Sequence, residues 1–328
     1  MAAMKKILVA IKDLDAASLP AVRKAAQIAM ATGATLELYH ALSESILVDA
    51  LDARRISLKD YEQGQVEAAL KRLETIAKRI RKHDVEVVCA AEWDFPAAEA
   101  VVRRALKTQA DLIVAERHAS RHVAGWMLAY TDWELLREAP CPVLLVKLPR
   151  PYHRPVVMTA LDPFHAHAKP TRLDDALLES AARMTENLHG ALRIVHCVAP
   201  ASMVTAGWMT GPVVIADPHS DAAMKRARQA LAGEVARHAL PSHKLAVIEG
   251  VAREALPLAA KSMKAQIVVM GALSRSGMQR VLIGNTAEAV LDAMPCDVLV
   301  VKPGRFQTKV PRKSRGAHLL ALPTAMTG

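Results

Sequence analysis

The sequence is poor in aromatic residues, and it has no long hydrophobic run. Phe, Trp and Tyr together make up 3% of the 328 residues, which argues against a surface that stacks the bases of a single-stranded nucleic acid. No apolar stretch reaches the roughly 18 residues that a membrane-spanning helix needs. The first residues, MAAMKKILVAIKD, lead straight into a strand-like run and show no cleavage site, so they do not resemble a signal peptide. We therefore expect a soluble, cytoplasmic protein with no membrane partner.

Cysteine is scarce as well, and its spacing excludes the common cysteine motifs. The four cysteines are Cys89, Cys141, Cys197 and Cys296, and none of them belongs to a CxxC pair. Each lies in or beside an apolar run that is typical of a strand. We therefore expect reduced, structural thiols instead of zinc ligands or a redox centre.

Motifs of the common nucleotide-dependent and hydrolytic enzymes are also missing. The sequence has no GxxxxGK[ST] loop, no GxGxxG after a strand and no GxSxG elbow,. His165 and His167 form an HxH pair, but without a third ligand two solvated histidines are the simpler interpretation. No nucleophile, base and orienting group come together. We predict a protein that is not an enzyme, with no catalytic residue and no metal.

The balance of charge is basic, with a formal net charge of +10. The tail after Pro303 contains no acidic residue but several basic ones: Arg305, Lys309, Arg312, Lys313 and Arg315. Such a tail can bind nucleic acid or an anionic membrane. A solvated surface with a disordered tail is the simpler interpretation, and nucleic-acid binding is kept as an alternative only.

Strand-like runs of Val, Ile and Leu alternate with amphipathic helical segments along the whole chain. This order predicts an α/β fold in which parallel strands are joined by helical crossovers on both faces of a sheet. In the first half we expect strands at 6–11, 35–40, 85–90, 111–115 and 143–147, and helices at 19–31, 59–82, 96–107 and 131–138. In the second half we expect strands at 155–161, 191–198, 244–249, 266–270 and 298–302, and helices at 174–188, 220–238, 252–262 and 286–293.

The two halves are copies of one another. Residues 140–147, PCPVLLVK, match residues 295–302, PCDVLVVK, without a gap, and Thr131 matches Thr286 in the same register. The length of the chain also suits two domains of about 150 residues. We predict a domain at 1–150, a second at 151–304 and a basic C-terminal tail at 305–328. The second copy has an extra loop near 200–218, which is either a lid or interaction surface or a plain surface loop.

A candidate ligand site lies at residues 271–288, GALSRSGMQRVLIGNTAE, where a strand is followed by a glycine-bearing loop and a helix start. Free backbone N–H groups and the positive end of the helix dipole suit a phosphate there. Gly271 and Gly284 let the backbone come close to a ligand. Asn285 can cap the helix, with Glu288 as its capping-box partner. A simple turn followed by a helix cap would show the same residues, so both interpretations stay open.

In a doubly wound sheet, ligands bind at the carboxyl ends of the strands where the strand order reverses. If the order in each half is 3-2-1-4-5, the reversal in the second half lies between strands that end at Asp162 and Gly271. The end of the second strand, at Cys197 and Val198, would form an apolar wall for a base. The candidate nucleotide-binding residues are Asp162, Val198, Gly271, Ser274, Gly284, Asn285 and Thr286.

The first half lacks these features. Its residues at the positions of Gly271, Ser274, Gly284 and Asn285 are Glu116, Ala119, Ala129 and Tyr130. Both glycines are gone, and a carboxylate stands where a phosphate would approach. We predict no phosphate site in the first half.

The chain resembles the universal stress proteins, in particular the tandem two-domain kind called the E type. The most specific stretches are residues 131–137, TDWELLR, residues 284–288, GNTAE, and residues 306–308, FQT. The resemblance implies an adenine nucleotide alpha hydrolase-like fold with five parallel strands per domain in the order 3-2-1-4-5. It also implies an internal pseudo-dimer in which the two halves pair through their last strands, and a homodimer is a further expectation.

The ATP-binding members of that family carry the pattern Gly-x2-Gly-x9-Gly-Ser/Thr. Gly271 and Gly284 match its first and third glycines, while Ser274 and Asn285 replace the second glycine and the final Ser/Thr. Asp162 matches the family's acid after the first strand. The resemblance thus implies ATP or a related nucleotide as ligand of the second half.

In the first half Lys12 takes the place of that acid and Asp13 lies one position beyond it, so no ligand residues are assigned there. We predict a non-catalytic stress-response protein that binds a nucleotide or another small phosphate-containing ligand in its second half. The alternatives are a ligand-free interaction protein, a weak ATPase that uses Asp162, and a nucleic-acid binder that uses the basic tail.

Overall fold

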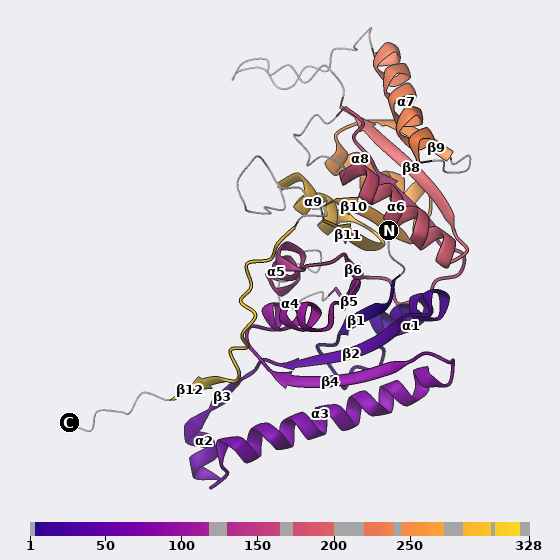
Figure 1. The fold of residues 1–328 in the computed structure, drawn as a ribbon. Helices are drawn as coiled ribbons and strands as arrows, with labels where there is room; N and C mark the ends of the chain where they lie inside the picture. The colour runs from indigo at the N-terminus through magenta and orange to yellow at the C-terminus, as the bar shows by residue number, and fades with distance from the viewer. Residues whose placement is uncertain are drawn as a thin grey trace, which may run out of the picture. The chain divides into compact units, whose positions relative to one another are not determined.

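The computed structural model describes residues 4–117, 130–164, 173–199, 220–238, 244–271, 285–302 and 306–321. The chain divides into two compact units (Figure 1). The first unit comprises Met1–Ser120, Leu128–Pro151 and Gln307–Gly328, and the second comprises Arg121–Met127 and Tyr152–Phe306. Each unit has an α/β fold with a parallel sheet, as the sequence predicts.

The first unit is built on five parallel strands in the order β4-β2-β1-β5-β6. These strands are β1 (Lys6–Ala10), β2 (Thr35–Leu42), β4 (Val87–Trp93), β5 (Leu112–Glu116) and β6 (Val143–Val146). The central strand β1 is covered on both faces, so that Ile7, Leu8 and Val9 are completely buried. This explains why its sequence is continuously apolar and does not alternate.

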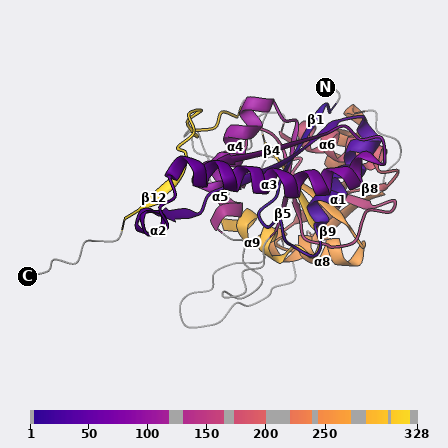
Figure 2. The same ribbon diagram turned by 90° about the horizontal axis from the view of Figure 1, so that it is seen from below.

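Helices cover the sheet of the first unit. The helices described in this unit are α1 (Pro20–Thr32), α2 (Val48–Ala53), α3 (Leu58–Arg81), α4 (Ala97–Thr108) and α5 (Tyr130–Glu138). Helix α3 runs along β4 and β2 (Figure 1, Figure 2), whereas α1 packs on β1 and β5, and α4 packs on β1 and β2. Helix α3 begins where the Ser57 side chain accepts a hydrogen bond from the Asp60 amide, and such a cap satisfies one of the free N–H groups of the first turn.

The second unit has the same arrangement, with strand order β11-β10-β7-β8-β9. Its strands are β7 (Val156–Ala160), β8 (Ala191–Val198), β9 (Lys244–Glu249), β10 (Ile267–Gly271) and β11 (Asp297–Val301), all paired in parallel. Its helices are α6 (Leu173–Asn187), α7 (Ser220–Arg237), α8 (Ala252–Ser262) and α9 (Asn285–Ala293). Central β7 is the counterpart of β1 and buries Val157, Met158 and Thr159 completely.

After the second unit the chain returns to the first. Strand β12 (His318–Leu320) pairs in parallel with β3 (Ser45–Leu47), and the His318 ring stacks on Phe95 with ring centroids 4.6 Å apart. The Arg315 amide donates a hydrogen bond to the buried Asp94 carboxylate at 3.0 Å. Residues 306–321 therefore differ from the disordered tail that we expected from their charge.

Candidate functional site

The predicted residues of the second unit lie at the carboxyl ends of neighbouring strands. Val269 of β10 is opposite Thr159 of β7, and Ala160 of β7 is opposite Val195 of β8. Asp162 follows β7, while Gly271 and Val198 end β10 and β8. These three residues therefore share one edge of the sheet, at the point where the strand order reverses.

Asp162 has an unsatisfied acceptor. Its side chain is half-buried, and its Oδ2 atom is buried with no hydrogen-bond partner in the part of the chain that the structure describes. Buried carboxylate oxygens are almost always hydrogen-bonded. Leu161 is held in place just before it, because its amide donates to the Val195 carbonyl at 2.9 Å. Asp162 therefore offers an unsatisfied acceptor that suits a hydroxyl or N–H group of a ligand.

A packing contact explains why residue 271 is a glycine, and the surrounding sequence does not show that contact. Its backbone is not in the left-handed region, but a Cβ atom there would lie 2.8 Å from Cδ2 of Leu173 and 3.3 Å from its Cγ. Leu173 is the first residue of α6 and is only 1% exposed. The absence of a side chain at position 271 lets α6 pack onto the end of β10. We expected this glycine to serve a ligand, and packing alone accounts for it.

The remaining predicted residues are placed only in part. Ser274 and Gly284 lie outside the described residues, and so do the His165–His167 pair and the loop near 200–218. Asn285 and Thr286 are the first two residues of α9. The helix therefore starts within the last residues of the candidate segment 271–288.

Each unit also has a histidine at the end of its second strand that the sequence analysis overlooked. Nδ1 of His40 lies 2.8 Å from the Ile11 carbonyl, and Nδ1 of His196 lies 2.9 Å from the Leu161 carbonyl. Because a carbonyl only accepts, Nδ1 carries the proton in both rings, and Nε2 of the neutral ring is an acceptor. The two histidines occupy matching positions of the repeat, and this match is the signal that could have identified them.

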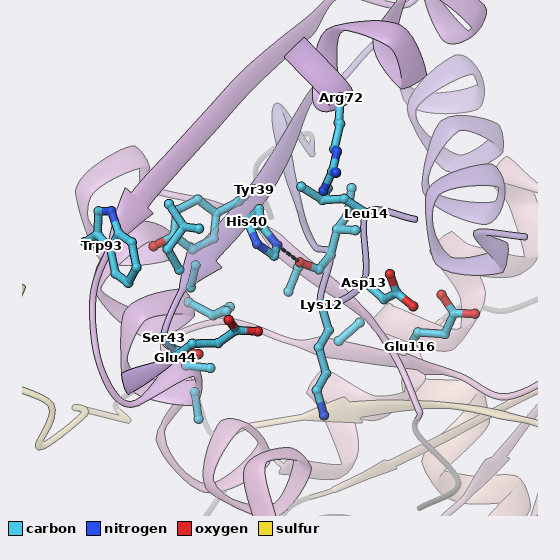
Figure 3. Close-up of a pocket in the computed structure, with 18 of the residues that line it drawn as sticks. Lys12, Asp13, Leu14, Tyr39, His40, Ser43, Glu44, Arg72, Trp93 and Glu116 are labelled. Carbon is cyan, nitrogen blue, oxygen red and sulfur yellow. Dashed lines mark hydrogen bonds between the residues drawn. The ribbon is translucent and has the colours of Figure 1, made fainter. Parts of the chain in front are cut away.

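A cavity of about 660 Å³ opens in the first unit (Figure 3). It lies at the carboxyl ends of β1, β2, β4 and β5, which is the topological counterpart of the predicted site in the second unit. The loop after β1 supplies Lys12 and Asp13, and β2 supplies Tyr39 and His40. We assigned no ligand residues to this half, so the cavity is a feature that sequence reasoning missed.

The cavity is acidic. Two basic side chains, Lys12 and Arg72, face five carboxylates at its wall: Asp13, Asp15, Glu44, Glu116 and Asp132. Arg72 already forms an ion pair with Asp15 at 3.1 Å. An excess of carboxylates repels phosphate, so the lining of this cavity does not favour a phosphate group.

Two groups in this cavity have shifted pKa values. Burial raises the pKa of Glu116, an effect that the charges of Arg23 and Lys24 and a backbone hydrogen bond from Ala21 partly offset. Burial also raises the pKa of Tyr39 far above its ordinary value. The Tyr39 hydroxyl therefore keeps its proton at neutral pH, and it is buried with no hydrogen-bond partner among the described residues.

All four cysteines are free thiols, and only Cys296 is fully buried. Burial raises the pKa of Cys197 to about 11, and burial together with the nearby Glu74 raises the pKa of Cys89 to about 12. Both thiols are protonated at neutral pH and are poor nucleophiles. Among the described residues, no group of three or more His, Cys, Asp or Glu side chains could hold a metal ion. No helix in that part of the chain is long and apolar enough to cross a membrane.

Comparison with known proteins gives a consistent result. The family model described as "Universal stress protein family" matches residues 4–147 and 170–302. Universal stress protein E of Escherichia coli K12 is 26% identical over 326 residues, which cover 94% of this chain and 98% of that protein. A universal stress protein E homolog of Haemophilus influenzae is 26% identical over 232 residues, which cover 68% of this chain and 72% of that protein.

Solved structures of the same kind share the fold. A putative universal stress protein from Pseudomonas aeruginosa UCBPP-PA14 is 24% identical, with a TM-score of 0.69 and coverage of 92% of this chain and 94% of that one. A universal stress protein from Archaeoglobus fulgidus is 16% identical, with a TM-score of 0.65 and coverage of 91% and 98%.

Proposed function

Because this chain belongs to the universal stress protein family, we propose that it is a non-catalytic stress-response factor of the cytoplasm that binds ATP or a related nucleotide in its second unit. The observation that carries the proposal is the buried, unsatisfied Oδ2 atom of Asp162. It lies at the edge of the sheet where β7 and β10 end side by side. A nucleotide offers ribose hydroxyls and base N–H groups to such an acceptor.

The other parts of the site have complementary roles. The half-buried Val198 at the end of β8 offers an apolar surface to the base. The segment from Ser274 to Gly284 leads into the start of α9, where backbone N–H groups and the helix dipole favour a phosphate. Asn285 would hold the phosphate through an amide in place of the hydroxyl that the family pattern has.

The proposed role is binding without turnover. It follows from the sequence motifs, in which no nucleophile, base and orienting group come together,. His196 of β8 is an acid-base group close to Asp162, and these two side chains do not by themselves complete such a set,. Nucleotide hydrolysis that scales with protein concentration and disappears in the Asp162→Asn variant would revive the weak ATPase alternative.

The direct test is calorimetric titration of the full chain with ATP, AMP and UDP-glucose. We expect at least one of them to bind. Asp162→Asn removes a charged acceptor without changing size and should weaken binding about tenfold or more. Gly284→Asp should abolish it, because a carboxylate would occupy the phosphate position. Glu116→Gln, in the first unit, is the matched control and should bind like the unmodified protein.

A folded sample that gives no heat with any of the three nucleotides would contradict this proposal. The interaction-protein alternative would then be favoured, and one observation already suits it: packing against Leu173 accounts for Gly271 without any ligand. That alternative predicts that Gly284→Asp leaves survival under stress unchanged, whereas the nucleotide proposal predicts a loss.

A further inference from the structure

Phe164 is an exposed aromatic side chain at the candidate site of the second unit. It follows Asp162 by two residues, just beyond the carboxyl end of β7, and 53% of its surface is exposed. Removing apolar surface from water is favourable. A ligand that covers this ring therefore gains affinity from the contact.

The Phe164 ring packs against a buried histidine. Its centroid lies 5.7 Å from the centroid of the His196 ring, in an edge-to-face arrangement, which is a favourable geometry for two aromatic rings. His196 is buried, and its Nδ1 atom donates a hydrogen bond to the Leu161 carbonyl at 2.9 Å. Because this bond holds the imidazole in place, the phenylalanine has a fixed partner at the edge of the sheet.

The repeat indicates which way this position faces. In each unit a histidine of the second strand donates to a carbonyl just beyond the first strand, that of Ile11 in the first unit and that of Leu161 in the second. Three residues after these carbonyls come Leu14 and Phe164, which are therefore counterparts. Leu14 and the histidine of its unit both line the cavity of the first unit (Figure 3). We therefore expect Phe164 to face the equivalent space of the second unit.

Val198 lies on the same face of β8 as the histidine that contacts Phe164. Val198 and His196 are two positions apart in one strand, and side chains two positions apart point to the same side of a sheet. Val198 is also the residue closer to the carboxyl end. An aromatic ring and a half-buried valine thus offer apolar surface on one side of the sheet, and such surface suits a flat base.

We propose that Phe164 determines the specificity of the second unit for purine nucleotides, because its ring stacks on the base. This inference rests on the nucleotide binding proposed above and specifies which part of the ligand is recognised. Stacking on an aromatic side chain tolerates any base, since every base has a π-face. A purine has two fused rings and covers more of the phenylalanine than a pyrimidine does. Leu14, the counterpart in the first unit, has no ring to offer.

The test is calorimetric titration of the full chain with ATP, CTP and inorganic triphosphate. We expect ATP to bind at least about threefold more tightly than CTP. Inorganic triphosphate has phosphates but no base, so it reports on phosphate binding alone. Proton NMR supplies a second readout: the base protons of bound ATP should move upfield, because the face of an aromatic ring shields protons that lie above it.

Variants separate the ring from its apolar character. Phe164→Leu removes the ring but stays apolar, so it should weaken ATP binding about tenfold and change triphosphate binding less than about twofold. Phe164→Trp restores a ring and should bind ATP at least as tightly as the unmodified protein. Phe95→Leu is the matched control in the first unit, where Phe95 stacks on His318 with ring centroids 4.6 Å apart, and it should leave ATP binding unchanged. Because Phe164 is exposed, its variants should keep the urea midpoint of the unmodified protein.

Three results would overturn the inference and leave the proposed nucleotide binding intact. The first is ATP binding to Phe164→Leu that equals binding to the unmodified protein. The second is CTP binding as tight as ATP binding. The third is an equal loss of ATP and triphosphate binding in Phe164→Leu, which would indicate a general disturbance of the site and not a lost stacking contact. If the folded, unmodified protein binds no nucleotide at all, the proposed function itself is contradicted, and this inference with it.

Discussion

Replacing Gly271 by alanine tests whether this glycine serves packing or a ligand. The new methyl group would lie 2.8 Å from Cδ2 of Leu173, whereas carbon atoms are most stable about 3.5–4.0 Å apart. Neither side can yield easily. Leu173 is 1% exposed, and Gly271 is held in the sheet opposite Val301 of β11. Overpacking of this kind costs about 1–3 kcal/mol of unfolding free energy, and we expect Gly271→Ala to lose that amount.

A double-mutant cycle isolates the contact. Leu173→Ala removes Cγ, Cδ1 and Cδ2, the three atoms that would lie within 3.5 Å of the new methyl group. Alone it should cost about 2–5 kcal/mol, because it leaves a cavity. In the double variant the new methyl group has room and fills part of that cavity. The losses of unfolding free energy in the two single variants should therefore add up to more than the loss in the double variant, by about 1–3 kcal/mol.

The assay is urea unfolding of the full chain, followed by far-UV circular dichroism without nucleotide. Gly233→Ala is the matched control in the same unit, because a Cβ atom at that position of α7 meets nothing within 4 Å. It should gain about 0.5–1 kcal/mol, as a glycine inside a helix is unfavourable. The reasoning is refuted if Gly271→Ala is as stable as the unmodified protein, or if the costs of the two single variants simply add.

Three further predictions follow from buried polar contacts. Arg103 donates two hydrogen bonds to Asp94, at 2.6 Å and 2.8 Å, and the two side chains are only 5% and 4% exposed. Arg103→Met should lower the free energy of unfolding in urea by about 3–5 kcal/mol, because it leaves the Asp94 carboxylate buried without its ion-pair partner. A loss below about 1 kcal/mol would contradict this prediction. The Tyr152 hydroxyl donates a hydrogen bond to Asp297 at 2.6 Å. Tyr152→Phe should lower the free energy of unfolding by about 1.5–3 kcal/mol in the same assay. An unchanged urea midpoint would exclude this hydrogen bond. Burial raises the pKa of Glu116 in the folded state above its ordinary value, so the folded state binds the proton more tightly and stability falls as pH rises through the interval above that ordinary value. Glu116→Gln should therefore raise the melting temperature at pH 7 but not at about pH 3, below the ordinary pKa of a glutamate, and equal effects at both pH values would show that the carboxylate charge is not the cause.

The secondary structure shows how much local sequence can predict. Every strand and helix expected from the apolar periodicity is present, with ends shifted by at most a few residues. Three short elements were not expected: β3, α2 and β12. Strands β3 and β12 pair across most of the chain, with Ser45 opposite His318. A three-residue strand has too little pattern of its own, so only its distant partner defines it.

The C-terminal segment shows how composition alone can mislead. Its many basic residues predicted a disordered, solvated tail. In the structure the backbone amides of Arg315 and Lys309 donate to the Asp94 and Glu138 carboxylates at 3.0 Å and 2.9 Å. These contacts involve the main chain, which composition does not describe.

The candidate sites also combine features that the sequence predicts with features that only the structure shows. The position of Asp162 beside the end of β10 could be predicted from the sequence. It requires only the ends of two strands and their order, because parallel strands bring their carboxyl ends to one edge of the sheet. The packing role of Gly271 did not follow, since it depends on Leu173 of α6, far away in sequence. The acidic cavity of the first unit was not predicted. The absence of the glycine pattern there indicates that a phosphate is unlikely to bind, but it does not indicate that a cavity is present.

The sequence by itself determined the two-fold repeat, the α/β class of each unit and the asymmetry between them, since these depend on periodicity, repeated residues and local loop chemistry. The tertiary structure alone decided which side chains share a space. It set Leu173 against Gly271, and it left the Asp162 and Tyr39 oxygens without partners in the described chain. Such contacts join residues that are distant along the chain, and their geometry depends on how whole helices pack on the sheet.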